Sequence, residues 1–543
     1  MSREDGSPER SGHVDTFAAD NLPPRELWPA MPVTEARFRT PARLNCVSAL
    51  LDARLAAGDG ERPCMLAPGE SLTYAAFAAR VNRIANVLVG RLGLRTGNRV
   101  LLRSANTPTM AAAYLAVLKA GGIVVATMPL LRAGEIAFPA RKAEVTLALC
   151  DGTLSAEMER ARPLVPTLRQ VVYWGDGATG SLESLEAAAS AEFAAADTAA
   201  DDIALIAFTS GTTGEPKGTM HAHKDMLAIV EGFAAEIVGA TRDDRFVGSA
   251  PFAFTFGLAM LLFPLRVGAS AVLLAKAGPN EIGEAVGRFG ATVCFTAPTA
   301  YRAMLARPAE YDLRTLRRCI SSGEPLDRAT FERWRDATGL PLINVLGATE
   351  MLHAFVAAAV EPIRPGSLGR PVRGFVVRGV DEAGHPVPPG TLGRLAVRGP
   401  LGCRYLADAR QTSYVQDGWN MPGDAVRQDP DGTLWYAARA DDMIVSAGYN
   451  IAGPEVEAAL LSHPAVAECG VVGAPDPERG TIVKAYVLPA PGVEPSPALA
   501  RALQEHVKAT IAPYKYPRAV AFVTALPKTA SGKLQRFALR AMA

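Results

Sequence analysis

The chain alternates between short apolar runs and longer stretches in which apolar residues recur every three or four positions. The runs are typical of buried strands and the spaced pattern of amphipathic helices. In the first half this pattern predicts helices from Val47, over 72–92 and over 107–120. It predicts strands at 98–103, 123–126, 145–150, 170–174, 203–208, 270–275, 292–295, 317–320 and 341–345. Such alternation predicts an α/β architecture of stacked, largely parallel sheets.

The last third of the chain has a different texture. After about residue 365, short strands are separated by tight turns such as Asp429-Pro-Asp-Gly432, which indicates a β-rich subdomain. The final block has its own alternation, with strands at 444–446, 466–472, 482–488 and 519–523 and helices from Pro454 and over 497–510. We therefore predict an extended arm over 1–40, a large domain over 41–440 and a small, mobile α+β domain over 441–543.

Composition narrows the class of protein. A length of 543 residues with 49% hydrophobic and 20% charged residues indicates a multidomain globular protein. A net charge of +1 argues against nucleic acid or an anionic membrane as the main partner. The seven cysteines are scattered without a C-x-x-C pair, which favours a reducing cytoplasm and gives no sign of a metal site. The start lacks the apolar core of a secretory signal, and Lys119 and Arg266 interrupt the most apolar stretches, so we expect a cytoplasmic protein without membrane insertion.

One segment has the composition of a phosphate-binding loop. Thr209-Ser-Gly-Thr-Thr-Gly-Glu-Pro-Lys-Gly218 follows the apolar run 203–208 and contains four hydroxyls, three glycines and one lysine. Glycines allow close backbone approach, while hydroxyls, N–H groups and a lysine can bind phosphate oxygens. Composition alone would equally suit a surface turn. The segment is not a Walker loop, because Pro216 precedes Lys217 and Gly218 follows it.

The segment resembles the phosphate-binding loop of the adenylate-forming superfamily of acyl- and aryl-CoA synthetases, luciferases and peptide synthetase adenylation domains. Five further stretches resemble motifs of that family in the same order: 321–326, 344–350, 418–424, 436–442 and 526–534. The resemblance covers nearly the whole chain. It implies that ATP is bound by Thr209, Ser210, Gly211, Thr212, Thr213, Gly214, Lys217, Gly323, Glu324, Pro325, Asn344, Gly347, Ala348, Thr349, Asp424 and Arg439.

The resemblance also implies separate roles for a few residues. Glu350 would hold Mg²⁺ against the ATP phosphates, and Asp424 would accept from both ribose hydroxyls. Lys533 would be the catalytic lysine, bridging the acid and the α-phosphate. Because Lys533 belongs to the small domain, chemistry is expected to need domain closure about a hinge at Asp441. A second arrangement would line a tunnel for CoA with Ser446, Ala447, Gly448 and Tyr449.

The acid is expected to be aromatic. Ala250-Pro-Phe-Ala-Phe-Thr-Phe-Gly257 stands at the family's acyl-pocket position, and its phenylalanines suit a flat apolar slot. Glu350-Met-Leu-His353 resembles the benzoate and 2-aminobenzoate CoA ligases in particular, and we favour 2-aminobenzoate by a small margin. His353 could equally be a core histidine. The pocket residues implied are Phe254, Thr255, Phe256, Tyr301, Leu346 and His353.

The leading hypothesis is an AMP-forming aryl-CoA ligase that joins a small aromatic acid to CoA through an aryl-adenylate, acting as a monomer or homodimer. One alternative is a stand-alone adenylation enzyme that loads a carrier-protein thiol. Another is a nicotinamide-dependent oxidoreductase, since Gly175–Gly180 matches G-x-G-x-x-G. A third is a nucleotide-binding regulator without catalysis.

Overall fold

The computed structural model describes residues 10–175, 180–209, 215–324, 326–359, 362–439, 442–446, 449–476, 480–511, 513–529 and 532–543. The chain divides into two compact units, and each is described by itself. Unit 1 comprises Met1–Ser210, Pro216–Val377 and Val397–Asn420, and unit 2 comprises Gly211–Glu215, Arg378–Ala396 and Met421–Ala543. The predicted domain boundary at 440/441 lies outside the described residues and stays a prediction.

The first sheet of unit 1 is built from the apolar runs of the first 220 residues. Its order is β6-β5-β3-β4-β7-β8. All neighbours are parallel except β7 and β8, which are antiparallel. The strands are β3 (Arg99–Arg103), β4 (Ile123–Thr127), β5 (Leu147–Asp151), β6 (Gln170–Trp174), β7 (Ile203–Phe208) and β8 (Gly218–Ala222).

The second sheet of unit 1 has the order β15-β14-β13-β12-β11-β9-β10-β1-β2. The strands from β13 to β1 are mutually parallel, and antiparallel strands close both edges. They are β1 (Pro63–Ala67), β2 (Glu70–Thr73), β9 (Arg245–Gly248), β10 (Ser270–Val272), β11 (Val293–Thr296), β12 (Arg318–Ser321), β13 (Leu342–Gly347), β14 (Ala354–Ala357) and β15 (Arg370–Pro371).

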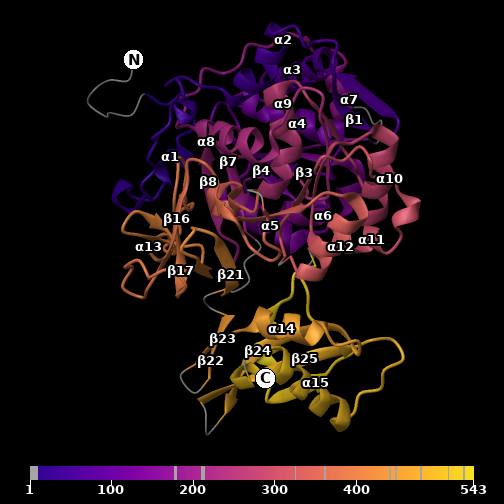
Figure 1. Ribbon diagram of the computed structural model, residues 1–543. Coiled ribbons are helices and arrows are strands. Elements are labelled where there is room, and N and C mark those ends of the chain that lie inside the picture. Colours follow the sequence, from indigo (N-terminus) through magenta and orange to yellow (C-terminus); the bar gives the residue numbers. More distant parts are fainter. Residues whose placement is uncertain are drawn as a thin grey trace. The chain divides into compact units, whose positions relative to one another are not determined.

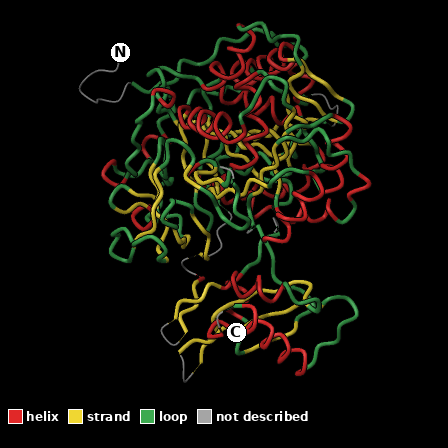
Figure 2. Tube along the Cα trace, viewed as in Figure 1, coloured by secondary structure: helices red, strands yellow, loops and turns green. Residues whose placement is uncertain are grey.

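Helices cover and separate the two sheets, so the strands of unit 1 lie among helices (Figure 2). Helix α4 (Pro108–Lys119) touches β3 and β4 of the first sheet and β1 of the second. Every residue of α4 except Thr109 is buried. This burial agrees with its Ala-rich sequence, because a helix that is apolar on all sides is a buried helix. The other helices include α3 (Tyr74–Gly90), α5 (Ala133–Lys142), α6 (Ser155–Ala161), α8 (His223–Ile229), α9 (Ala259–Val267), α10 (Pro279–Phe289), α11 (Pro298–Leu305) and α12 (Arg328–Thr338).

The topology explains why several motifs meet at one edge of the second sheet. Strands β9, β11, β12 and β13 are parallel, so their carboxyl ends lie at the same edge. Ligands of α/β proteins bind at this edge. The segments that follow these strands begin at residues 249, 297, 322 and 348, and they contain the predicted slot, adenine loop and carboxylate motif.

Unit 2 is rich in antiparallel strands. Near its start β17 (Leu392–Arg398) pairs with β20 (Asp424–Gln428), which pairs with β21 (Leu434–Arg439). Further along, β24 and β25 pair with each other beside α14, and α14 packs on α15 (Figure 1). The remaining bounds are β22 (Met443–Ser446), β23 (Tyr449–Ala452), α14 (Gly453–Leu461), β24 (Val466–Asp476), β25 (Gly480–Pro489), α15 (Pro497–Thr510), β26 (Ala519–Phe522) and α16 (Arg536–Ala541).

The α/β architecture predicted from the sequence is confirmed, with local corrections. The segment from Val47 forms a π-helical turn (Ser48–Asp52) followed by the short α2 (Ala53–Ala56), not one regular helix. Leu72 belongs to β2, and α3 begins two residues later because the Thr73 hydroxyl accepts the Ala76 N–H as an N-cap. Among the described residues, none of the helices has the length and apolarity needed to cross a bilayer.

The N-terminal arm follows the surface of unit 1 and is fastened at many points. It contains the short helical turns α1 (Phe17–Asp20), η1 (Arg25–Leu27) and η2 (Ala36–Phe38). The Gly12 N–H donates to the Asp202 carboxylate at 2.8 Å, and the Ala30 N–H donates to the Gly418 carbonyl at 2.9 Å. These bonds tie the arm to segments far along the chain.

Candidate functional site

The predicted phosphate loop joins the antiparallel pair β7 and β8. Ser210–Gly214 lie outside the described residues, but both ends of the loop are placed. The Thr209 N–H donates to the Lys217 carbonyl at 2.9 Å, and the Lys217 N–H donates to the Thr209 hydroxyl at 3.2 Å. The hairpin therefore fixes where the loop starts and where its lysine stands.

The predicted metal carboxylate stands on a tight turn at the end of β13. Glu350 belongs to a 3₁₀ turn (Thr349–Met351) and is 6% exposed. Leu352 ends the turn with φ +56°, a conformation that bulky residues rarely adopt. This strained turn points Glu350 and His353, three residues apart, into different surroundings, and such strain is often found at functional sites.

The Glu350 carboxylate is met by a lysine and a tyrosine. The Lys217 Nζ lies 3.8 Å from Glu350 Oε1, and the Tyr405 hydroxyl donates to the same oxygen at 2.5 Å. The Lys217 ammonium also lies 5.0 Å from the Tyr405 ring centre and 5.7 Å from that of Tyr414. Burial, and then the Glu350 carboxylate, raise the pKa of Tyr405 far above its usual range, so its hydroxyl stays a donor.

A buried ion pair lies beneath this group. Asp225 and Arg404 are both fully buried, and the Arg404 guanidinium donates to the Asp225 carboxylate. Burial alone would raise the pKa of Asp225, but Arg404 and then His221 hold it at about 2. The His221 Nδ1 lies 3.8 Å from Asp225, while its Nε2 lies within hydrogen-bond distance, 2.8 Å, of the Thr349 carbonyl. The pair is thus linked through His221 to the turn that carries Glu350.

The predicted acid slot is aromatic on several sides. His353 is 2% exposed, and its ring is surrounded by the rings of Phe233, Phe263, Phe256 and Phe295 at centroid distances of 4.7, 5.0, 5.6 and 6.4 Å. Burial lowers the pKa of His353 to about 3, so its imidazole is neutral. Within the described residues, neither ring nitrogen has a hydrogen-bond partner. A buried polar group of this kind calls for a ligand or another explanation.

The remaining slot residues are placed unequally. Phe254 precedes and Thr255 begins the turn that carries Phe256, and Leu346 lies near the end of β13. Tyr301 is a correction to the predicted set. It is fully buried on α11, its hydroxyl lies 3.1 Å from the Cys294 and Ile320 carbonyls, and its ring meets Trp334 at 4.6 Å. Tyr301 therefore supports the sheet from inside the core and is not retained as a slot residue.

The loop and strand predicted for adenine are partly described. Gly323 has φ +91°, and Pro325 lies outside the described residues. Glu324 accepts from the Thr299 hydroxyl and lies 4.0 Å from Arg302. Asn344 is 6% exposed and donates to the Ser367 carbonyl at 2.9 Å, which gives it a structural role.

Of the other residues in this motif, Gly347 has a steric reason to be glycine. A side chain there would come within 2.8 Å of the His353 carbonyl and 2.9 Å of the Ala354 Cα. Ala348 precedes the turn that carries Glu350. The motif therefore also fixes the path of the chain toward His353.

Unit 2 contains the residues predicted for ribose. Asp424 and Arg439 face each other across β20 and β21, with Arg439 Nη1 3.6 Å from the carboxylate. The same guanidinium donates to the Pro422 carbonyl at 2.6 Å. The two residues therefore lie side by side on paired strands, and their role toward ribose stays a prediction.

The other predicted residues of unit 2 lie on two hairpins. Lys533 is exposed on a turn closed by the Thr529 N–H donating to the Lys533 carbonyl at 2.8 Å. Ser446 ends β22 and is 3% exposed, while Tyr449 begins the pairing strand β23. Asp441, Ala447 and Gly448 lie outside the described residues, so the predicted hinge and tunnel stay predictions.

Sequence profiles of two families match the chain. The AMP-binding enzyme profile matches residues 53–405, and the profile of the AMP-binding enzyme C-terminal domain matches residues 455–533. The chain belongs to the AMP-binding enzyme family. Membership of this adenylate-forming group agrees with the order of the motifs and with the short distance, 3.8 Å, between Lys217 and Glu350.

Relatives of this AMP-binding enzyme include aryl-CoA ligases. A benzoate–CoA ligase of Thauera aromatica is 35% identical over 93% of this chain and 98% of its own length. The crystal structure of the anthranilate CoA ligase AuaEII in complex with anthranoyl-AMP has a TM-score of 0.88 at 33% identity, covering 94% of this chain and 99% of that one. A benzoate CoA ligase from Burkholderia xenovorans LB400 has a TM-score of 0.83 at 32% identity, covering 92% and 100%.

Several residues of the site were not found by sequence reasoning. Tyr405, Arg404 and Asp225 support the Glu350 side, and Phe233 and Phe263 complete the rings around His353. One signal could have indicated a buried polar group: His221 and Asp225 stand in a region whose other residues are mostly apolar.

Proposed function

We propose that this AMP-binding enzyme is an AMP-forming aryl-CoA ligase whose acid is 2-aminobenzoate or a close analogue. The observation that carries the proposal is the neutral imidazole of His353, which is buried among phenylalanine rings and has no described hydrogen-bond partner. The family supplies the reaction class, in which an acid and ATP give an acyl-adenylate and pyrophosphate, and a thiol then displaces AMP. The benzoate and anthranilate ligases among its relatives support an aromatic acid.

The imidazole favours a ring with a hydrogen-bonding substituent. Phenylalanine rings provide apolar faces and edges for an aromatic acid. Plain benzoate has no hydrogen-bond donor for the unprotonated nitrogen of His353, and leaving a buried polar group unpaired costs about 1–3 kcal/mol. An ortho-amino group can donate an N–H hydrogen bond to the unprotonated nitrogen. This difference supports 2-aminobenzoate over benzoate.

We call the group around Lys217 and Glu350 the phosphate side. This group fits a nucleotide that arrives with Mg²⁺. Among the described residues there is no cluster of three or more His, Cys, Asp or Glu side chains able to hold a metal by itself. A single buried carboxylate, Glu350, suits Mg²⁺, which usually takes one or two carboxylates together with phosphate oxygens and water. When bound, the ion would neutralise phosphate charge. Lys217 would turn from Glu350 to the phosphates, and the Thr209 hydroxyl stands at the entrance of their loop.

The residues of unit 2 complete the proposal. Asp424 would accept from the ribose hydroxyls, with Arg439 beside it holding the carboxylate in place. Lys533 would stabilise the charge that gathers between the acid and the α-phosphate. Asp441 is proposed as the hinge, and Ser446–Tyr449 as the lining of the CoA tunnel.

The test is acid-dependent exchange between ATP and pyrophosphate. The acids would be benzoate, 2-aminobenzoate, salicylate, phenylacetate and a medium-chain fatty acid. We expect the highest kcat/KM with 2-aminobenzoate, and AMP release on addition of free CoA. Exchange restricted to fatty acids would overturn the aryl assignment. AMP release with a holo carrier protein but not with CoA would favour the carrier-loading alternative.

A variant of the catalytic lysine separates the two half-reactions. Lys533→Ala is expected to abolish exchange but to leave thioester formation from preformed aryl-adenylate largely intact. Equal loss of both would contradict a role confined to adenylation.

A further inference from the structure

Tyr405 joins the two charged groups of the phosphate side. It is fully buried, its hydroxyl donates to Glu350 Oε1 at 2.5 Å, and its ring lies 5.0 Å from the Lys217 ammonium. Tyr414 extends the aromatic surface, with its ring centre 5.5 Å from that of Tyr405. One phenol therefore contacts the proposed metal carboxylate through its oxygen and the phosphate-loop lysine through its ring.

We propose that Tyr405 is a positioning residue for Glu350 and Lys217. Its hydroxyl fixes the orientation of the carboxylate, and its ring keeps the ammonium beside that carboxylate until a nucleotide draws the lysine away. The proposal rests on the proposed function, in which Glu350 receives Mg²⁺ and Lys217 the phosphates. A hydrogen bond to an ionised carboxylate is stronger and shorter than a neutral one, and an ammonium is attracted to the face of an aromatic ring.

The backbone holds Tyr405 in register with Lys217. The segment around Tyr405 runs along β8, the strand that begins directly after Lys217. The Leu406 N–H donates to the Gly218 carbonyl and the Met220 N–H to the Arg404 carbonyl, both at 2.8 Å. Because these bonds lie on either side of Tyr405, the distance between the tyrosine and the lysine is set by strand pairing.

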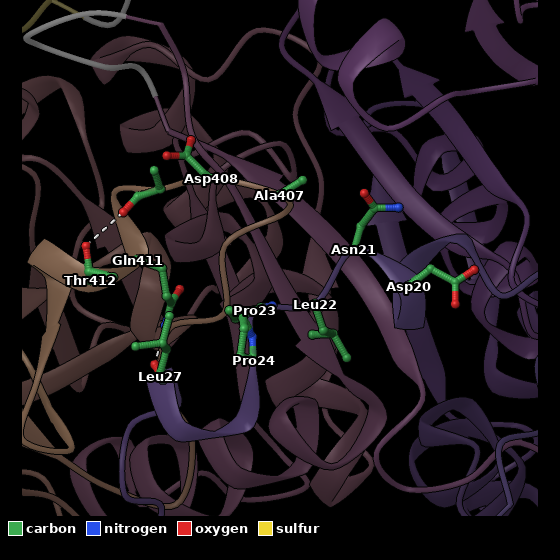
Figure 3. Close-up of a pocket in the computed structure, with 11 residues that line it drawn as sticks. Asp20, Asn21, Leu22, Pro23, Pro24, Leu27, Ala407, Asp408, Gln411 and Thr412 are labelled. Atoms are coloured by element: carbon green, nitrogen blue, oxygen red, sulfur yellow. Dashed lines mark hydrogen bonds between the residues drawn. The ribbon is translucent and has the colours of Figure 1, made fainter.

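A buried glutamine fastens the segment from behind. The Tyr405 N–H donates to Gln411 Oε1 at 2.9 Å, and Gln411 Nε2 donates to the Leu27 carbonyl of the N-terminal arm at 2.8 Å. A pocket of about 260 Å³ marks where the arm meets the loop after Tyr405. In Figure 3, Leu22, Pro23, Pro24 and Leu27 of the arm line it together with Ala407, Asp408, Gln411 and Thr412. The backbone of Tyr405 is therefore held from both sides, which keeps its side chain in one position.

A purely structural role makes a different prediction. Tyr405 belongs to a small core cluster with Cys403, Tyr414 and Val415. If it only filled this core, removing its hydroxyl would lower stability but would not change how strongly Mg²⁺ promotes ATP binding. The coupling between Mg²⁺ and ATP is thus the quantity that separates the two roles.

The experiment compares Tyr405→Phe with a matched core variant. Tyr74→Phe also removes a buried hydroxyl, one within 2.6 Å of the Ala269 carbonyl, and Tyr74 is no part of the proposed site. Calorimetry would measure ATP binding with and without Mg²⁺, exchange assays the half-saturating Mg²⁺ concentration, and thermal unfolding the Tm. We expect Tyr405→Phe to reduce the Mg²⁺-dependent gain in ATP affinity about tenfold and to raise half-saturating Mg²⁺ similarly. Tyr74→Phe should lower only the Tm.

Each outcome bears on one proposal. Wild-type coupling in Tyr405→Phe, with a lower Tm, would overturn the positioning role and leave the proposed function standing. A wild-type protein that binds no ATP with Mg²⁺ would overturn the proposed function and this inference with it. Tyr405→Leu adds a check on the ring. Because the ring holds the ammonium beside Glu350, its loss should strengthen ATP binding in the absence of Mg²⁺ relative to Tyr405→Phe, and weaker binding would contradict this hold.

Discussion

The slot around His353 and the phosphate side around Glu350 start from the same turn, Thr349–Met351, but differ in how their polar groups are paired. On the phosphate side, the Glu350 carboxylate already has Lys217 and the Tyr405 hydroxyl, and Asp225 has Arg404. In the slot, the imidazole of His353 has phenylalanine rings around it and no described hydrogen-bond partner. The charged groups of one side are paired before any ligand binds, whereas the imidazole of the other side is not.

The difference suggests how each half would recognise its ligand. A buried charge without partners is very costly, so the phosphate side needs internal partners that a nucleotide and its metal can replace. A neutral imidazole is cheaper to leave unpaired, and its unmet hydrogen bonds can select the acid. A site that is built to bond a polar substituent discriminates strongly against an acid that lacks it.

The largest expected effect comes from breaking the buried ion pair beneath the phosphate side. Arg404→Met leaves Asp225 buried without its cation, and loss of one partner of a buried pair typically lowers the free energy of unfolding by about 3–5 kcal/mol. Urea denaturation of Arg404→Met measures this loss. The double variant Arg404→Met/Asp225→Asn should recover part of it, since no buried charge remains. Arg314→Gln, which breaks an exposed pair with Asp312, should leave the midpoint unchanged. Equal stability of Arg404→Met and wild type would contradict the comparison.

The next effect is the pH dependence of stability that the buried imidazole of His353 causes. The unfolded imidazole binds a proton below about pH 6.5, whereas burial lowers the pKa of folded His353 to about 3. Between these values the unfolded state holds more protons, so the free energy of unfolding falls as the pH decreases. By this linkage His353 should account for about 2 kcal/mol of destabilisation at pH 5 relative to pH 7.5.

His353→Phe isolates that contribution. The difference in unfolding free energy between pH 7.5 and pH 5 should shrink by roughly the same amount in the variant. His223 remains in both proteins, and burial lowers its pKa to about 3 as well, so part of the acid sensitivity should persist. An unchanged difference between the two pH values would show that His353 is not buried in a neutral form.

Sequence reasoning located what is encoded locally and missed what is brought together by folding. The strands at 123–127, 203–208 and 342–347 follow from short apolar runs, and Lys217 and Glu350 were singled out because their motifs resemble those of the family. Tyr405 could not be found in this way. It lies 188 positions from Lys217 (405 − 217), and only the pairing of its segment with β8 brings the two side chains together.

Tyr301 shows the opposite error. The family resemblance placed it in the slot. Which face of α11 a residue occupies depends on how that helix packs, and Tyr301 lies on the inward face against Trp334. Position in a motif therefore does not give the direction of each side chain.

The smallest expected effect concerns selectivity and tests whether the two halves act separately. His353→Phe removes the group proposed to accept the ortho-amino hydrogen and leaves an aromatic slot. The ratio of kcat/KM for 2-aminobenzoate to that for benzoate should fall about tenfold, the value of one hydrogen bond, while the KM for ATP stays the same. Lys217→Met should do the reverse, raising the KM for ATP without changing the acid preference. If His353→Phe changed the KM for ATP as much as the acid ratio, the turn between Glu350 and His353 would be transmitting the change, and the two halves could not be treated as independent.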